Sequence, residues 1–359
     1  MAVLPFKNPS SDADLEALAG GLSEDVATGL SRFPYLQVIA SNSAMAYKGR
    51  SADIRTVGRE LGARYVLEGS VRKAGSAVRV STQLVDAASG AQLWAEAYDR
   101  DLANLGIFAV QDEIIDRVVA TVADPYGVLV RSMALTVRDK PLEELTDTEL
   151  RLRFFAYWHQ VRPDEHARLR VALEQRLERE PAQADAWACL SRLYSHEHQH
   201  RLNPLPDSVE RARNAARRAV EIDPTCQLGW EALADASYFA RDLGTFRTAA
   251  ERAVSLNPRN TSTVTTMAML IAYGGEWERG VEITRGAMAL NPHHPGWYHF
   301  TLFWDHFRNH EYEEALETAK RINMPEFFWT HVVTAAVCGR LGRRDEARAA
   351  LDALRNLFP

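Results

Sequence analysis

The chain has 359 residues, of which 46% are hydrophobic and 25% charged, the balance of a globular protein with room for two or three domains. Its formal net charge of -6 argues against a general phosphate-backbone binder, so nucleic acid is not an expected partner. Three scattered cysteines give no disulfide framework, and no run of about 18 apolar residues stands out, so we expect a cytoplasmic protein without a membrane segment.

The first part of the chain, residues 1–135, alternates strand and helix patterns. Strands are predicted at 2–6, 36–40, 65–72, 77–86 and 91–98. Helices are predicted at 12–33, 53–61 and 107–135. The short apolar start is no signal peptide, and a chain that opens on a strand suggests a piece of a longer protein. We expect an α/β domain with a small mixed sheet, followed by a linker over 136–146.

Four phrases follow one another in this part, at residues 2–8 (AVLPFKN), 21–25 (GLSED), 64–72 (RYVLEGSVR) and 93–100 (LWAEAYDR). Together they resemble the TolB-like amino-terminal α/β domain over about residues 1–125. The resemblance implies a bacterial regulatory domain that commonly precedes tetratricopeptide repeats. It also implies that the pair often follows a class III adenylate or guanylate cyclase domain, or a winged-helix DNA-binding domain. It implies no catalytic residue.

A repeat dominates the sequence beyond residue 146. Prolines 181, 224, 258, 292, 325 and 359 are separated by 43, 34, 34, 33 and 34 residues, and the tetratricopeptide period is about 34. Small residues at the expected helix crossings include Ala212, Ala216, Ala219, Ala250 and Ala253. Residues 147–359 are therefore predicted to form five or six two-helix units, four of them clear from 184. The fold class is α+β: the α/β domain followed by an all-α superhelix that resembles tetratricopeptide arrays.

Two departures from the period predict local irregularities. The spacing of 43 places an insertion near residues 195–207, and the unit before Pro325 is expected to have a shortened second helix. An additional unit is predicted ahead of the clear ones, with helices at 150–160 and 163–180.

His196, Glu197 and His200 fit the H-E-x-x-H pattern of helical zinc proteases, in which two histidines share a helix face and the glutamate acts as general base. No third ligand follows at metalloprotease spacing, and the motif lies where the insertion begins. A solvated loop is therefore favoured. A metal site at His196 and His200, and a zinc hydrolase, are kept as alternatives, and no cofactor is expected.

The first helices of the repeat units are expected to line a concave groove that binds peptides. The predicted partner-binding residues are Arg192, Glu231, Asp235, Tyr238, Phe239, Met269, Tyr273, His299, Phe303, His306 and Phe307. This wall is aromatic with few positive charges, which favours an apolar or aromatic peptide over an acidic C-terminal tail. The alternative is that these aromatic side chains pack inside the protein.

We therefore predict a non-catalytic regulatory module that binds a protein or peptide partner, or another copy of itself. The sequence has no Gly-rich phosphate loop and no Gly-x-Ser-x-Gly elbow. One alternative is the regulatory part of a nucleotidyl cyclase whose catalytic domain lies outside these residues. A small-molecule sensor with its ligand between the two domains is another.

Overall fold

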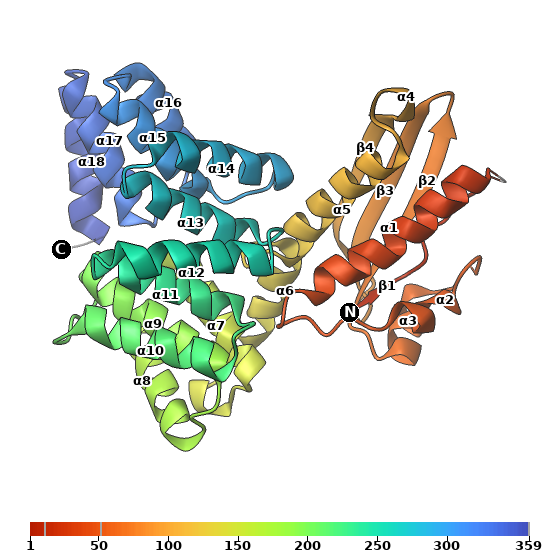
Figure 1. The fold of residues 1–359 in the computed structure, drawn as a ribbon, viewed down its shortest axis with the longest axis horizontal. Helices are drawn as coiled ribbons and strands as arrows, with labels where there is room; N and C mark the ends of the chain where they lie inside the picture. Colours follow the sequence, from red (N-terminus) through yellow and green to blue (C-terminus); the bar gives the residue numbers. More distant parts are fainter. Residues whose placement is uncertain (11, 51, 358–359) are drawn as a thin grey trace. The chain divides into compact units, whose positions relative to one another are not determined.

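The computed structural model describes residues 1–10, 12–50 and 52–357. It divides into two compact units, residues 1–132 and the chain from Met133 onward (Figure 1). Instead of a free linker over 136–146, helix α6 (Val128–Val137) continues across the division, and the 3-10 helix η1 (Leu142–Glu144) follows it. Pro359, the last of the periodic prolines, lies outside the described residues.

The first unit is built on the predicted small mixed sheet, with strand order β1-β2-β3-β4. The strands are β1 (Ala2–Val3), β2 (Tyr65–Ala74), β3 (Ala77–Asp86) and β4 (Ala91–Asp101). β1 runs parallel to β2, and the other neighbours are antiparallel. β1 is shorter than predicted because Pro5 has no N–H to donate, although the chain rejoins β2 where Lys7 pairs with Ser70.

Two long helices, α1 (Ala13–Ser31) and α5 (Ile107–Ala123), pack against each other beside the sheet (Figure 1). Asp12 begins α1 as predicted, because its side chain accepts hydrogen bonds from the backbone N–H groups of Asp14 and Leu15 at 2.9 and 3.2 Å. The short helix α3 (Ile54–Leu61) ends as predicted at Gly62, whose φ of 62° lies in the left-handed region that glycine tolerates.

Two predicted elements of this unit are wrong. Residues 36–40 form no strand; Ile39 donates one backbone hydrogen bond to Met1, and the helix α2 (Ser41–Met45) follows directly. The single helix predicted at 107–135 is broken into α5 and α6. Pro125 explains the break, because it lacks an N–H and disfavours helical backbone at Asp124, whose ψ is 148°.

The stretch Ile107–Val137 is long and apolar enough, by length and composition, to cross a membrane, although no such segment was expected from the sequence. However, 67% of its apolar window is buried inside the folded chain. Val110, Ile114 and Val118 are 0% exposed on α5, which packs on α1. Core packing therefore accounts for the apolar character of this helix.

The described part of the second unit contains six consecutive helix pairs. They are α7 (Asp147–Gln160) with α8 (Pro163–Arg179), α9 (Ala184–Gln199) with α10 (Ser208–Ile222), α11 (Gln227–Phe239) with α12 (Leu243–Leu256), α13 (Thr261–Tyr273) with α14 (Trp277–Leu290), α15 (His299–Arg308) with α16 (Tyr312–Ile322), and α17 (Phe328–Arg340) with α18 (Arg344–Leu357). The 3-10 helix η2 (Gly296–Tyr298) precedes α15. Each pair packs on the next in sequence order, so the predicted succession of two-helix units is present.

Small residues let the paired helices approach closely. On α10, which packs on α9 and α11, Ala212, Ala216 and Ala219 are 0% exposed. The predicted insertion is confined to residues 200–207, because α9 continues to Gln199. The predicted shortening of α16 is confirmed: it has 11 residues, against 14 in both α12 and α14.

Candidate functional site

The inner side of the helix pairs is formed by their first helices, where most of the predicted groove residues lie. Arg192 on α9 and Asp235 on α11 form an ion pair at 2.5 Å, with side chains only 5% and 3% exposed. The guanidinium of Arg192 also stacks 5.0 Å from the ring of Trp158, and Gln199 donates to Asp235 at 2.9 Å. These contacts join neighbouring pairs, and they use the polar groups that an open groove would offer to a ligand.

Other predicted groove residues are also internal. Glu231 accepts a buried hydrogen bond of 2.6 Å from the Thr263 hydroxyl, which joins α11 to α13. His299 is 9% exposed, and Phe303 is 0% exposed. The prediction that all eleven residues line an accessible groove is therefore corrected for Arg192, Glu231, Asp235, His299 and Phe303. Arg192, Glu231 and Asp235 contact residues of neighbouring first helices, and Phe303 packs in the core formed by α15, α16 and α17, so these side chains meet protein instead of solvent.

The two histidines of the H-E-x-x-H motif lie on α9 and at its end, and not in a solvated loop. His196 is 1% exposed, and its Nδ1 lies 2.8 Å from the hydroxyl of Tyr157. The rings of His196 and His200 are 5.0 Å apart, and Nδ1 of His200 accepts a hydrogen bond from Trp329 at 3.3 Å. The favoured loop assignment was wrong, because periodicity alone did not show that the insertion begins only after α9 has completed another turn.

Glu197 faces away from the two histidines. Its carboxylate is fully buried and pairs with Arg170 at 2.8 Å and with Arg211, and it also accepts the backbone N–H of Leu205 at 3.2 Å. Two guanidinium groups therefore compensate its charge, which fixes the inserted loop to α8 and α10. No group of three or more potential metal ligands occurs among the described residues. The arrangement joins helices and offers no general base beside a metal.

Burial sets the charge state of this histidine cluster. Desolvation, assisted by the neighbouring His200 and Arg192, holds the pKa of His196 well below its usual range. Desolvation and the charge of Arg192 also lower the pKa of His200, and desolvation lowers the pKa of His166, whose Nε2 lies 3.0 Å from the carbonyl of Leu193. All three imidazoles are therefore neutral at physiological pH.

The remaining predicted groove residues are half-buried, and several of them belong to a row of partly exposed side chains that we call the aromatic edge. It consists of Tyr238, Phe239, Tyr273, Trp277, Phe307, Arg308, Tyr312 and Arg340. Each residue lies where a first helix ends or a second helix begins, so successive pairs place them along one edge of the array. Met269 and His306 are also half-buried, and Nδ1 of His306 lies 2.6 Å from Glu311.

Ring and guanidinium contacts connect the aromatic edge from one pair to the next. Tyr238 contacts Phe239 at 5.2 Å, and its ring reaches the turn at Gly274. The Tyr273 ring lies 5.6 Å from that of Trp277, over which the Arg308 guanidinium stacks at 4.9 Å. Arg340 likewise stacks 4.9 Å from the Tyr312 ring. Trp277 and Tyr312 were missed from the sequence because they begin second helices, and only first helices were expected to face a partner. Arg308 and Arg340 end first helices but were not among the predicted groove residues.

Two comparisons with known proteins bear on this architecture. Residues 1–117 match the family model described as "HilA/YgeH-like transcriptional regulator, second domain". Over 263 residues the chain is 36% identical to "Putative adenylate cyclase 3" of Rhizobium meliloti (strain 1021). That match covers 68% of this chain and 41% of the relative, so the chain spans less than half the length of the curated relative it matches. The TolB-like resemblance stays a prediction, because the matching model carries a different description.

Solved structures with similar helical arrays include TTC0263, a thermophilic tetratricopeptide protein of Thermus thermophilus, and human IFIT1 in its dimer with m7Gppp-AAAA. The first is 18% identical with a TM-score of 0.42, covering 54% of this chain and 96% of that one. The second is 15% identical with a TM-score of 0.47, covering 64% of this chain and 55% of that one.

Proposed function

We propose that this chain is a regulatory interaction module that binds a partner protein along the aromatic edge. Half-exposed aromatic and arginine side chains are the residue types that dominate protein interfaces, because they bury large areas at low conformational cost. The aromatic edge supplies them over four successive helix pairs, with cation–π contacts that already hold several of the rings in place. This continuous edge is the observation that carries the proposal.

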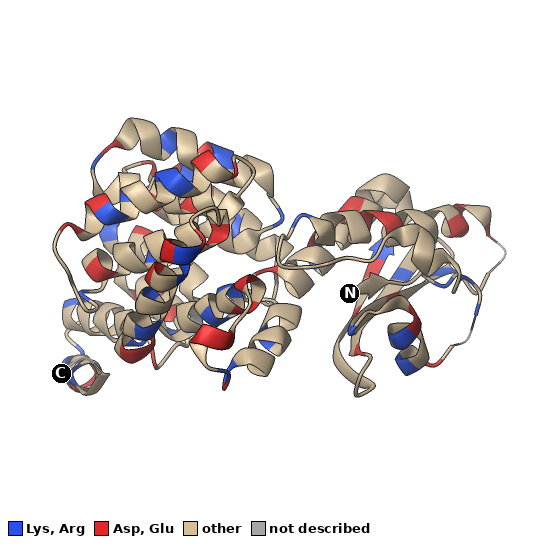
Figure 2. Ribbon diagram, turned by 90° about the horizontal axis from the view of Figure 1, so that it is seen from below, with Lys and Arg blue, Asp and Glu red and all other residues tan. Residues whose placement is uncertain are grey.

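The distribution of charge supports a protein partner over a nucleic acid. Acidic and basic residues are interspersed along the helices, as Figure 2 shows, and the chain carries a net charge of -6. Near the aromatic edge, Arg247 pairs with Glu276 at 3.5 Å, and Arg308 pairs with Asp305 at 2.8 Å. Most of the positive charge at this edge is therefore locally compensated, whereas a phosphate backbone requires an excess of it.

We propose further that the module belongs to a larger signalling protein of the nucleotidyl cyclase kind. The support is the 36% identity to the relative named "Putative adenylate cyclase 3", of which this chain spans 41%. On this proposal the present residues supply regulation, and cyclisation of the nucleotide is carried out elsewhere in the larger protein.

A second candidate is the regulatory part of a transcriptional regulator. The specific observation in its favour is the match of residues 1–117 to the second domain of HilA/YgeH-like regulators. The reading frame upstream of Met1 distinguishes the two candidates: an in-frame cyclase segment favours the first, and an in-frame winged-helix segment favours the second. A ribosome-binding site at Met1 weakens both.

The interaction itself is tested by capture of partners with wild-type chain and with a Tyr273→Ser/Phe307→Ser variant, each cross-linked and identified by mass spectrometry. The matched control is Phe108→Ser, which removes an aromatic ring that is 77% exposed far from this edge in the sequence. We expect a partner that the wild type and the control retain and the edge variant loses. Equal capture by all three proteins, or no specific capture at all, would remove the proposal.

A further inference from the structure

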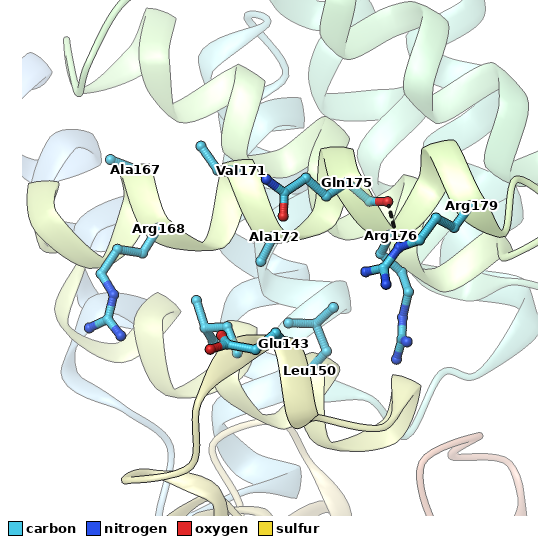
Figure 3. Close-up of a pocket in the computed structure, with 10 residues that line it drawn as sticks. Glu143, Leu150, Ala167, Arg168, Val171, Ala172, Gln175, Arg176 and Arg179 are labelled. Atoms are coloured by element: carbon cyan, nitrogen blue, oxygen red, sulfur yellow. Dashed lines mark hydrogen bonds between the residues drawn. The ribbon is translucent and has the colours of Figure 1, made fainter.

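A second surface of the helical unit, separate from the aromatic edge, lies on its first helix pair. A groove of about 450 Å³ runs between α8 on one side and η1 with the beginning of α7 on the other. Its lining residues are Leu142, Glu143, Leu150, Ala167, Arg168, Val171, Ala172, Gln175, Arg176 and Arg179. Figure 3 shows Arg168 near one end of this stretch of α8, Arg176 and Arg179 near the other, and Ala172 between them.

The groove has a cause in the sequence of α8. In the following pair, α9 with α10, the positions where helices cross lie 12, 8 and 5 residues before the closing Pro224. They hold Ala212, Ala216 and Ala219. The same positions before Pro181 hold Leu169, Leu173 and Arg176. Leu169 and Leu173 are 0% and 1% exposed, and α8 packs on α9. The bulkier residues keep α7 from the close approach that alanines allow elsewhere, so one side of α8 stays open.

The charge of the groove is opposite to that of the chain. Its lining contains three arginines and one acidic residue, Glu143, within a chain of net charge -6. Arg176 is already engaged, with Asp147 and the Leu145 carbonyl each at 2.8 Å. Arg168 is 61% exposed, and its ion pair with Glu165 is long, at 3.5 Å, because the Glu165 carboxylate also pairs with Arg153. Arg179 has no carboxylate within ion-pair distance among the residues the structure describes, and it donates only to the Gln175 carbonyl.

The spacing of the two available arginines limits what can fill the groove. Arg168 and Arg179 are eleven residues apart on one helix, which is about 16 Å at the rise of an α-helix. A small anion cannot reach both, but an extended peptide of about five residues spans that distance. Between the two arginines the groove presents Val171, which is 44% exposed, and Ala172, so an aliphatic side chain fits between two carboxylates.

We propose that this groove binds an extended segment of a partner protein that carries two carboxylates about five residues apart, with aliphatic side chains between them. The inference rests on the proposed function as an interaction module and adds a second binding surface with its own chemistry. The carboxylates pair with Arg168 and Arg179, and the aliphatic side chains cover Val171 and Ala172. Because the ion pairs are exposed to solvent, binding weakens as salt concentration rises.

The test is selection of a random peptide display library on the complete chain, followed by titration of labelled synthetic copies of the enriched peptides. The test variant is Arg168→Glu/Arg179→Glu, with Arg168→Gln/Arg179→Gln as a second variant if the first loses its helical circular dichroism. The matched control is Arg344→Glu/Arg348→Glu, which makes the same change of charge at exposed positions of α18.

We expect enriched peptides with two acidic residues four to six positions apart around Leu, Ile or Val. Their affinity falls at least tenfold in the test variant and stays unchanged in the control. Enriched peptides without that acidic pattern, or equal binding by both variants, overturn the proposal. Binding to phosphatidylglycerol vesicles that depends on Arg168 and Arg179, without peptide enrichment, also overturns it.

The same selection separates failure of the groove from failure of the proposed function. If the enriched peptides lose binding to Tyr273→Ser/Phe307→Ser but keep binding to the arginine variants, the groove proposal fails and the interaction-module proposal stands. If selection enriches no peptide on any of the proteins, the groove proposal fails and the interaction-module proposal loses its support with it.

Discussion

Trp329 donates a hydrogen bond from Nε1 to Nδ1 of His200 at 3.3 Å, although 129 residues separate them in the sequence. His200 follows α9 in the second helix pair, and Trp329 lies in the first turn of α17 in the sixth. The rings of Phe327 and Phe328 lie 6.1 and 5.6 Å from the imidazole of His200. The contact ties together two pairs that are not neighbours, whereas a repeat array is held mainly by contacts between adjacent units.

Removing this long-range contact should lower the stability of the helical unit. We expect Trp329→Phe to reduce the free energy of unfolding by about 1 kcal/mol through loss of the hydrogen bond, and Trp329→Ala by about 3 kcal/mol through loss of the ring as well. Urea unfolding followed by circular dichroism measures both. Trp187→Phe is the control, because the Trp187 indole also donates to a carbonyl, that of Pro181, but one only six residues away in the sequence. If the two Trp→Phe variants unfold at the same urea concentration, the contact between the second and sixth helix pairs adds no stability beyond that of a local hydrogen bond.

The buried histidines should make the protein sensitive to mild acid. Desolvation holds the pKa of His196 and His200 below the value near 6.5 that they regain on unfolding. Between the folded and unfolded pKa values the unfolded chain binds more protons than the folded one. The free energy of unfolding is therefore highest above about pH 6.5 and falls as the pH drops below it. Each histidine contributes a slope of up to about 1.4 kcal/mol per pH unit.

Urea unfolding between pH 7.5 and pH 4.5 checks this dependence. The groups that face the two imidazoles are Tyr157 from α7, His166 from α8 and Arg192 from α9, and only His166 adds a titration of its own in this range. We expect His200→Gln to reduce the slope of the free energy of unfolding against pH by the contribution of one proton. A stability that stays constant from pH 7.5 to pH 5 would contradict the neutral, buried state of these side chains.

The buried ion pair of Arg192 and Asp235 should be costly to break but not to replace. Asp235→Ala leaves a guanidinium without its partner at a position where Arg192 is 4% exposed, so we expect a loss of about 3 kcal/mol. The double variant Arg192→Met/Asp235→Leu removes both charges and should recover most of that loss. A double-mutant cycle of Arg192→Met, Asp235→Leu and the double variant, followed by urea unfolding, measures the coupling. Additive losses in the cycle would show that the pair is not energetically coupled.

Two glycines of α1 should respond to alanine with opposite signs. A Cβ at Gly20 would meet no atom within 4 Å, so Gly20→Ala should raise the free energy of unfolding by about 0.5 to 1 kcal/mol through helix propensity. A Cβ at Gly29 would lie 2.7 Å from Cγ2 of Val119 on α5, so Gly29→Ala should lower it by about 1 to 3 kcal/mol. Thermal unfolding of the two variants tests the helix packing, and equal shifts would contradict it.

Several features could be predicted because their causes are local. The proline period and the small residues at the crossings predicted the helix pairs, and the counts around Pro325 predicted the short α16. The helix start at 12 and the helix end at 61 were predicted closely, and Asp12 and Gly62 cap these ends through chemistry that involves only nearby backbone. The strand at 36–40 failed for the opposite reason. An apolar alternation shows that one side of a segment is covered, but pairing into a sheet depends on a partner strand.

The sequence by itself determined the order and type of most elements, because periodicity and capping are written in residues close together along the chain. Only the tertiary structure decided that Arg192, Glu231 and Asp235 pair internally, and that His200 is covered by residues from the far end of the helical unit. A polar side chain on a helix face is compatible with solvent, a ligand or a buried partner. The choice among these depends on what distant segment covers that face, which no local pattern encodes.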